Sequence, residues 1–235
     1  MSSGLRRAAP SPLKGRVGPK PEFLARVAQR QAELRTKLAA LIPPTAALTL
    51  EIGSGHGHFL TRYAAEFPQR LCLGVDLISD RIRRSKRKAE RARLAHCHFV
   101  QAEARELIDA LPASVTFAEL WVLFPDPWPK KRHHKNRLLQ PAFFESIASR
   151  MVEGARLYFR TDHGEYFRAV TALFPKLQAW RIDPAGTWPL EQETVFQARA
   201  PGYHSLVAVR TSGPAITAEK AAPTPSGPAV PKSPA

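Results

Sequence analysis

The stretch Ala47-Leu-Thr-Leu-Glu-Ile-Gly-Ser-Gly-His-Gly57 decides the fold of this chain. Its first half, Ala47 to Ile52, is a short apolar run that predicts a buried strand. Its second half places a glycine at every other position, at Gly53, Gly55 and Gly57. Because glycine has no Cβ, such a turn lets a ligand approach the backbone closely. A strand that ends in this turn and leads into a helix predicts one unit of an α/β fold.

The chain from residue 21 to residue 210 continues this alternation of strands and helices. We expect strands over 47–52, 71–76, 97–100, 115–124, 155–161, 177–182 and 203–210. Helices are expected over 21–41, 59–67, 79–94, 105–110 and 141–150, with a further helix ending at 174. The pattern predicts a Rossmann-like α/β domain, with a mostly parallel seven-stranded sheet and helices on both faces.

Two of these helices carry more detailed expectations. In the first, Phe23, Leu24 and Val27 begin an apolar series at helical spacing, which predicts an amphipathic helix packed on the core. In the third, Ser79 or Asp80 is expected to cap the N-terminus. The exposed face of this third helix is strongly basic, with eight cations between Arg81 and Arg93 against one acid, Glu90.

The charge balance concerns partners more than fold. The chain has 235 residues, with 35 Lys and Arg against 20 Asp and Glu, a formal net charge of +15. Nucleic acid is the first partner that such a charge favours, and an anionic membrane surface is the second. The sequence contains no apolar run of about 18 residues, which is the length needed to span a membrane. Residues 1–20 read as a flexible basic arm, and residues 211–235 as a disordered tail rich in Pro and Ala.

The cysteine content and the N-terminus favour a cytoplasmic protein. Cys72 and Cys97 lie in predicted strands, so we expect both to be reduced and buried. The N-terminal residues include five cations and no apolar core of a signal peptide.

Acidic residues follow successive predicted strands. Glu51, Asp76 and Glu103 lie at or just past the ends of the first three strands, and Asp126 and Asp162 follow later ones. Ligands of open α/β sheets bind outside the carboxyl ends of the strands. We therefore expect these acids and the glycine turn to meet in one cleft.

The acids make S-adenosylmethionine a better ligand than a dinucleotide. Gly53 and Gly55 match the first two glycines of the dinucleotide fingerprint, but His58 stands at the third position. Glu51 would repel a phosphate and attract the ammonium group of S-adenosylmethionine. Asp76 could accept both ribose hydroxyls, and Glu103 could accept the adenine amino group. The alternative is a strand, turn and helix packed for structure alone.

The segment Phe124-Pro-Asp-Pro-Trp-Pro-Lys-Lys-Arg-His-His-Lys-Asn-Arg137 follows the fourth of these strands. Its three prolines predict a rigid loop. Asp126 lies in this loop before a cluster of cations, which suits chemistry on a polyanion. Such a carboxylate would stabilise positive charge on a methylated ring nitrogen. Trp128 could stack on a base or be buried for structure, and the chain's histidines lack the ligand spacing of a metal site.

These motifs resemble those of the bacterial tRNA (guanine-N7)-methyltransferases that modify the variable loop. The resemblance covers about residues 47–210 and is most specific in Phe124 to Trp128 and the cations that follow. Glu51-Ile-Gly53, Arg160-Thr-Asp162 and Thr194-x-Phe196 also fit.

The resemblance implies a role for each matching residue. S-adenosylmethionine would contact Glu51, Gly53, Gly55, Asp76, Glu103, Ala104 and Asp126. The tRNA would contact Lys130, Arg132, His133, Lys135, Asp162, Thr194, Phe196 and Gln197. Asp126 would be the catalytic carboxylate, and no metal is expected.

Three positions depart from the family pattern. Asn136 stands where arginine is usual, Pro129 where histidine is frequent, and Gln197 where the family has glutamate. A glutamate could accept the N1 and N2 protons of guanine together, whereas glutamine can do so only in part. Base selection or rate could therefore differ.

Two other functions stay open. One is a related methyltransferase that acts on another RNA, which Gln197 favours. The other is a catalytically silent RNA-binding protein of the same fold, although the cofactor acids are all present. The sequence does not distinguish a monomer from a homodimer.

Overall fold

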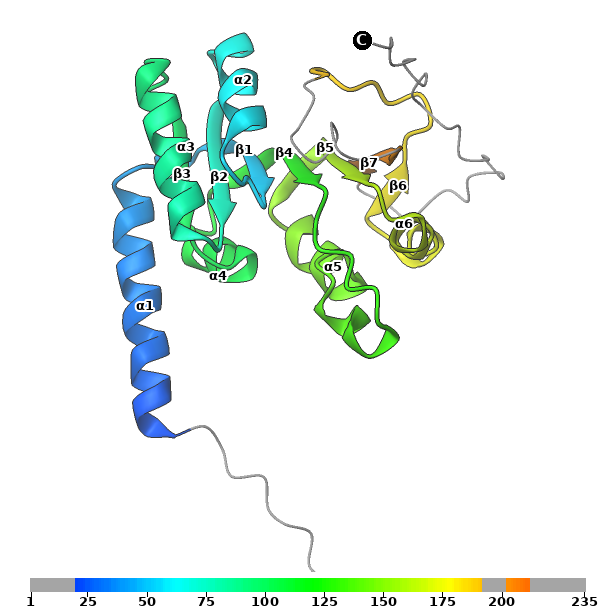
Figure 1. The fold of residues 1–235 in the computed structure, drawn as a ribbon, viewed down its shortest axis with the longest axis horizontal. Coiled ribbons are helices and arrows are strands. Elements are labelled where there is room, and N and C mark those ends of the chain that lie inside the picture. Colours follow the sequence, from blue (N-terminus) through cyan, green and yellow to red (C-terminus); the bar gives the residue numbers. More distant parts are fainter. Residues whose placement is uncertain (1–19, 192–201, 212–235) are drawn as a thin grey trace, which may run out of the picture.

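The computed structural model describes residues 20–191 and 202–211. Seven strands form one sheet in the order β3-β2-β1-β4-β5-β7-β6 (Figure 1). Their bounds are β1 Ala47–Ile52, β2 Leu71–Asp76, β3 Cys97–Gln101, β4 Thr116–Leu123, β5 Met151–Thr161, β6 Trp180–Ile182 and β7 His204–Arg210. Strands β1 to β5 pair in parallel, and β7 is antiparallel to both β5 and β6. The predicted mostly parallel seven-stranded sheet is confirmed.

Helices cover both faces of the sheet. They are α1 Pro21–Ala39, α2 His58–Glu66, α3 Ser79–Arg91, α4 Ala104–Ala110, α5 Pro141–Ala148 and α6 Gly164–Thr171, with short 3₁₀ helices η1 Lys131–Asn136 and η2 Phe174–Lys176. One apolar cluster includes residues of α1, α4, α5 and α6, and a second includes residues of α2 and α3. The two clusters lie on opposite faces, as expected for a parallel sheet.

The alternation of side chains along the central strands produces these two clusters. In β4, Leu120 and Val122 belong to the first cluster, whereas Trp121 between them belongs to the second. In β5, Tyr158 faces the second cluster and stacks on Trp121 with ring centroids 3.9 Å apart. Successive residues of a strand point to opposite faces, so each of these strands supplies both layers of core.

The strand order places a topological switch point beside β1. From β1 the chain builds outward through β2 to β3, and it then returns to add β4 on the other side of β1. The segments that follow β1 and β4 therefore lead to helices on opposite faces of the sheet, α2 and α5, and open α/β folds bind ligands between such segments, outside the carboxyl ends of the strands. The glycine turn, Gly53 to Gly57, follows β1, and the proline-rich loop, Phe124 to Arg137, follows β4.

The first helix differs from the prediction in its packing. Only Leu34 and Leu38 of α1 are buried, whereas Phe23 and Leu24 are each 51% exposed. Figure 1 shows the N-terminal half of α1, in blue, extending beyond the body of the domain. The helical spacing of apolar residues predicts the helix correctly. It does not show how much of the helix packs against the rest of the domain.

Three local predictions also change. The N-cap of α3 is Ile78 without a side-chain cap, and Asp80 instead forms ion pairs with Arg83 and Arg84. Strand β5 begins at Met151, four residues before the predicted start. The cationic half of the proline-rich loop forms η1, since residues 130–136 contain no proline that would prevent helical hydrogen bonding.

Two other findings concern the cysteines and the membrane. Cys72 and Cys97 are both buried with free thiols, as predicted. None of the helices that the structure describes has the length and apolar character needed to cross a membrane.

Candidate active site

The glycine turn leaves open space at the end of β1. Gly53, Gly55 and Gly57 have φ angles of 76°, 54° and 67°, which favour glycine. A Cβ added at Gly53 would meet nothing within 4 Å, and one at Gly55 would meet only the Gly53 carbonyl oxygen, at 3.9 Å. A Cβ at Gly57 would instead lie 2.8 Å from both Ser85 and Phe99. The first two glycines thus border free space, and the third permits close packing of α2 on α3.

Glu51 is a buried carboxyl group beside this turn. It is 3% exposed, and its Oε2 atom has no hydrogen-bond partner within the described residues. Burial raises the pKa of Glu51 to about 8, the backbone amide of Leu60 lowers this pKa in part, and the charge of Asp76 raises it further. A buried polar atom without a partner is costly. A cationic group that entered the open space would supply the missing partner.

Asp76 is fixed against the same turn. Its Oδ2 atom accepts a hydrogen bond from the Gly55 amide at 3.0 Å, and its Oδ1 atom accepts one from the Ile78 amide at 2.9 Å. The Arg81 guanidinium lies 3.6 Å from Oδ2. The structure therefore brings Asp76, Gly55 and Glu51 together, because β1 and β2 are neighbours.

Glu103 lies at the end of β3 and caps α4. Its Oε2 atom accepts hydrogen bonds from the amides of Arg105 and Glu106, at 2.8 and 3.0 Å. The next residue, Ala104, is buried. Capping holds the Glu103 carboxylate at the same sheet edge as Asp76, and among the described residues no side-chain hydrogen bond joins the two acids.

The proline-rich loop after β4 contains unusual backbone conformations. Phe124 and Trp128 have φ angles of 49° and 44°. Bulky residues seldom adopt positive φ, and such strain is concentrated at functional sites. Asp126 lies between them; it is exposed and makes no hydrogen bond or ion pair within the part of the chain that the structure describes. Its carboxylate is therefore available to a ligand.

Arg137 anchors the loop from its far end. Its side chain is 5% exposed, and its Nε atom donates to the Pro127 carbonyl oxygen at 2.8 Å. The guanidinium also pairs with both carboxylate oxygens of Glu165 and lies 4.8 Å from the centre of the Tyr166 ring. Sequence reasoning grouped Arg137 with the free cations, because nothing local distinguishes it from them.

The other cations of the loop remain accessible. Lys130, Arg132 and Lys135 are exposed, and His133 is half-buried with its ring edge-on to Trp128 at 5.8 Å. Trp128 is itself half-buried. These side chains form a basic rim next to Asp126 along the chain.

Arg160 is a second buried arginine that sequence reasoning did not single out as a site residue. It is 3% exposed, and its guanidinium lies 3.9 Å from the Trp188 ring centre and 4.5 Å from that of Tyr203. It donates to both carboxylate oxygens of Glu191 at 3.2 Å and to Ser205 Oγ at 2.9 Å. These contacts hold the chain on both sides of residues 192–201. Asp162, two residues after Arg160, is exposed, whereas Thr194, Phe196 and Gln197 lie outside the described residues.

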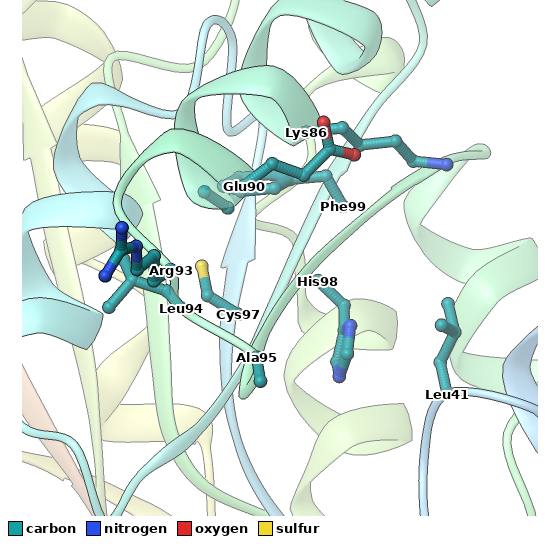
Figure 2. A pocket seen from close by; sticks show the side chains of 10 residues that line it. Leu41, Lys86, Glu90, Arg93, Leu94, Ala95, Cys97, His98 and Phe99 are labelled. Atoms are coloured by element: carbon teal, nitrogen blue, oxygen red, sulfur yellow. The ribbon is translucent and has the colours of Figure 1, made fainter.

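Two surface hollows are lined by none of the four acids Glu51, Asp76, Glu103 and Asp126. The larger, of about 440 Å³, is next to the start of β3 and is lined by residues that include Leu41, Glu90 and Cys97 (Figure 2). Because it adjoins the opposite ends of the strands, it is not part of the candidate active site. Among the described residues, no group of three or more His, Cys, Asp or Glu is placed to hold a metal ion.

Known proteins similar to this chain are methyltransferases. A family model described as "Putative methyltransferase" matches residues 45–200. The tRNA (guanine-N(7)-)-methyltransferase of Syntrophotalea carbinolica is 33% identical over 187 residues, which cover 76% of this chain and 79% of that protein. The enzyme of the same name from Treponema pallidum strain Nichols is 34% identical over 155 residues, covering 66% of this chain and 62% of its own length.

A solved structure supports the fold. The crystal structure of TrmN from Thermus thermophilus matches with a TM-score of 0.50 and 16% identity, over 77% of this chain and 48% of that one. At this identity the likeness concerns the fold alone.

Proposed function

This chain belongs to the bacterial tRNA (guanine-N7)-methyltransferase family, and we propose that it transfers a methyl group from S-adenosylmethionine to N7 of a guanine in tRNA. The observation that carries the proposal is Glu51, a buried carboxyl group with an oxygen that lacks a partner among the described residues, beside an open glycine turn. S-adenosylmethionine contains an ammonium group and no phosphate, which suits this position.

The residues at the sheet edge fit the remaining parts of the cofactor. Glu51 would pair with the ammonium group, and the open turn at Gly53 and Gly55 would lie against the cofactor. Asp76 would accept the ribose hydroxyls, since each of its oxygens already receives only one backbone amide hydrogen bond. Glu103 and Ala104 would border the adenine.

Methyl transfer to guanine N7 needs no covalent bond between the protein and the substrate. When bound, S-adenosylmethionine supplies an electrophilic methyl group, which guanine N7 takes through its lone pair as the bond from the methyl carbon to sulfur breaks. No proton needs to be removed, and the methylated ring gains positive charge. The chain's task is therefore to hold the base in line and to stabilise that charge.

Asp126 is the residue best suited to the second task. It is exposed beside the switch point, it has no partner among the described residues, and Arg137 fixes the loop that carries it. A carboxylate near N7 would stabilise the cationic ring as the methyl group arrives. Lys130, Arg132, His133 and Lys135 would bind the phosphates that flank the target guanine.

The RNA acceptor is the finer part of the proposal. The family resemblance favours the guanine of the tRNA variable loop, held by Asp162 and the segment from Thr194 to Gln197. Gln197 replaces a glutamate that could accept two guanine protons, so a related RNA is the second candidate acceptor.

The test is incubation of the protein with methyl-labelled S-adenosylmethionine and tRNA from cells that lack this modification, followed by nucleoside analysis. We expect label in 7-methylguanosine. The Asp126→Ala variant should bind the cofactor and turn over about 100-fold more slowly, with an unchanged melting temperature because Asp126 is exposed.

Three other outcomes would count against parts of this proposal. Unchanged turnover of Asp126→Ala would refute the catalytic role of Asp126. Cofactor binding with label only in other RNAs would move the acceptor away from tRNA. No cofactor binding at all would leave an RNA-binding protein without catalysis.

A further inference from the structure

A second hollow of about 420 Å³ lies on the surface where α3 meets the start of α2. It is lined by His56, His58, Arg84, Arg87, Lys88 and Arg91, and we call it the basic hollow. Two of the six come from the glycine turn and the first turn of α2, and four come from α3. Every lining residue is a cation or an imidazole, and no carboxylate lines it.

The cations of the basic hollow are poorly neutralised. Arg84 pairs with Asp80 at 2.8 Å, whereas Arg87, Lys88 and Arg91 make no ion pair with any carboxylate of the described residues. The Lys88 Nζ atom is buried and lacks a hydrogen-bond partner in the same part of the chain. A buried ammonium group without a partner is costly, so an anion that entered the hollow would be stabilised.

The pKa shifts of Lys88 and His58 are consistent with a hollow that favours an anion. Burial lowers the pKa of Lys88. Burial, Lys88 and His56 together lower the pKa of His58. Positive charges are therefore crowded in a partly dehydrated space, and a bound anion would relieve the repulsion.

The basic hollow is built on a rigid support. Ser85 Oγ lies 3.0 Å from the Gly55 carbonyl oxygen and 2.8 Å from that of Arg81, and its single hydroxyl proton, shared between these two acceptors, links α3 to the glycine turn. Ser85 itself is fully buried. The same turn that borders the proposed cofactor site thus holds His56 and His58 against α3.

We propose that the basic hollow binds phosphate groups of an RNA backbone, outside the methyl-transfer site. Arg84, Arg87 and Arg91 recur at helical spacing over seven residues, so they form a row about 10 Å long on one face of α3. Arginine forks match phosphate oxygens in bidentate geometry. A membrane surface fits less well, because the lining contains no large apolar residue that could enter a bilayer.

Phosphate binding in the basic hollow would extend the surface that contacts RNA from the proline-rich loop, across the glycine turn, to α3. This inference rests on the proposed function only for the choice of tRNA as the probe. The hollow would add affinity that depends on salt and not on base sequence, since phosphate contacts carry no sequence information.

The test compares two double variants of the full chain that remove the same charge from the same region. Arg87→Gln with Arg91→Gln changes the basic hollow. Lys86→Gln with Arg93→Gln changes the other hollow, which Figure 2 shows, and serves as the matched control. Binding of fluorescent tRNA is measured by anisotropy over a range of salt concentrations, together with the KM for tRNA in methyl transfer.

We expect the first double variant to bind tRNA at least about tenfold more weakly near 0.1 M salt, and to lower the slope of log affinity against log salt by about 1.5. Its KM for tRNA should rise while its affinity for S-adenosylmethionine is unchanged. The control should keep a slope within about 0.5 of the unmodified protein.

Equal effects of the two double variants would overturn the proposal, because general charge would then explain the binding. Unchanged tRNA affinity in the first variant, with binding to vesicles of phosphatidylcholine and phosphatidylserine lost, would also overturn it in favour of a membrane. If the unmodified protein made no 7-methylguanosine but the slope changed as expected, the proposed function would fail and the phosphate site would stand.

Discussion

At the scale of single residues, the candidate site contains two buried acids, Glu51 and Asp76, and an exposed acid, Asp126. Glu51 is buried, and its pKa is raised to about 8, whereas Asp126 is exposed on a strained loop. Burial suits a group that waits for a cationic ligand, because pairing then compensates a desolvation cost already present in the folded protein. Exposure suits a group that must reach a large substrate.

The pKa of Glu51 predicts how stability depends on pH. The folded protein keeps the Glu51 proton up to about pH 8, whereas the unfolded chain releases it near its ordinary value of 4.5. The contribution of Glu51 to the free energy of unfolding should therefore be complete below about pH 4.5 and be lost as pH rises to about 8. Glu51→Gln, which cannot ionise, should show a weaker decline in urea unfolding over this interval. Identical pH profiles for both proteins would contradict the assignment.

At the scale of secondary-structure elements, two buried arginines hold the loops that complete the site. Arg137 joins the proline-rich loop to α6 through Glu165, and Arg160 joins β5 to the chain on both sides of residues 192–201. Loops usually carry function on a rigid support. Here the support is supplied by guanidinium groups that donate to several partners at once.

The role of Arg137 leads to a prediction for the loop. Arg137→Leu should reduce the free energy of unfolding by about 2 kcal/mol, because the hydrogen bonds to Pro127 and Glu165 are lost. It should also slow methyl transfer about tenfold or more, because the loop would no longer hold the Asp126 carboxylate next to the reacting base. Lys131→Leu, a change of an exposed cation in the same segment, should leave stability within about 0.5 kcal/mol. If both substitutions changed urea unfolding equally, Arg137 would not be the anchor.

At the scale of the whole molecule, the order of strands creates the site. Strand β1 lies between β2 and β4, so the glycine turn and the proline-rich loop flank one switch point although about 70 residues separate them. Basic residues surround this edge on the loop and on α3. The net charge of +15 is thus concentrated, in part, where an RNA would meet the cofactor.

Cofactor binding should stabilise the whole domain. S-adenosylmethionine at about 100 times its Kd should add about 2.7 kcal/mol to the free energy of unfolding and raise the melting temperature by about 5–10 °C. Calorimetry measures this shift. NAD at the same concentration is the control, and it should give no shift because the carboxyl groups of Glu51 and Asp76, and no cationic side chain of the turn, border the open space where a pyrophosphate would lie. A shift with NAD alone would point to a dinucleotide enzyme.

Local sequence signals were sufficient for the strands, the glycine turn and the acids at the strand ends. The bounds of β1 are those predicted, and those of most other elements differ by a few residues. This agreement has a physical reason: apolar periodicity, glycine and proline act on neighbouring residues. The family motifs around Asp126 and Glu51 are local in the same sense.

The folded arrangement alone determined which cations are free and which are buried. Arg137 finds Glu165 28 positions away, and Arg160 finds Ser205 45 positions away, so neither contact leaves a trace in the sequence nearby. The exposure of Phe23 on α1 and the grouping of His56 with cations of α3 in the basic hollow also depend on the folded arrangement. Burial and pairing depend on what packs against a side chain, and in this domain those neighbours come from distant parts of the chain.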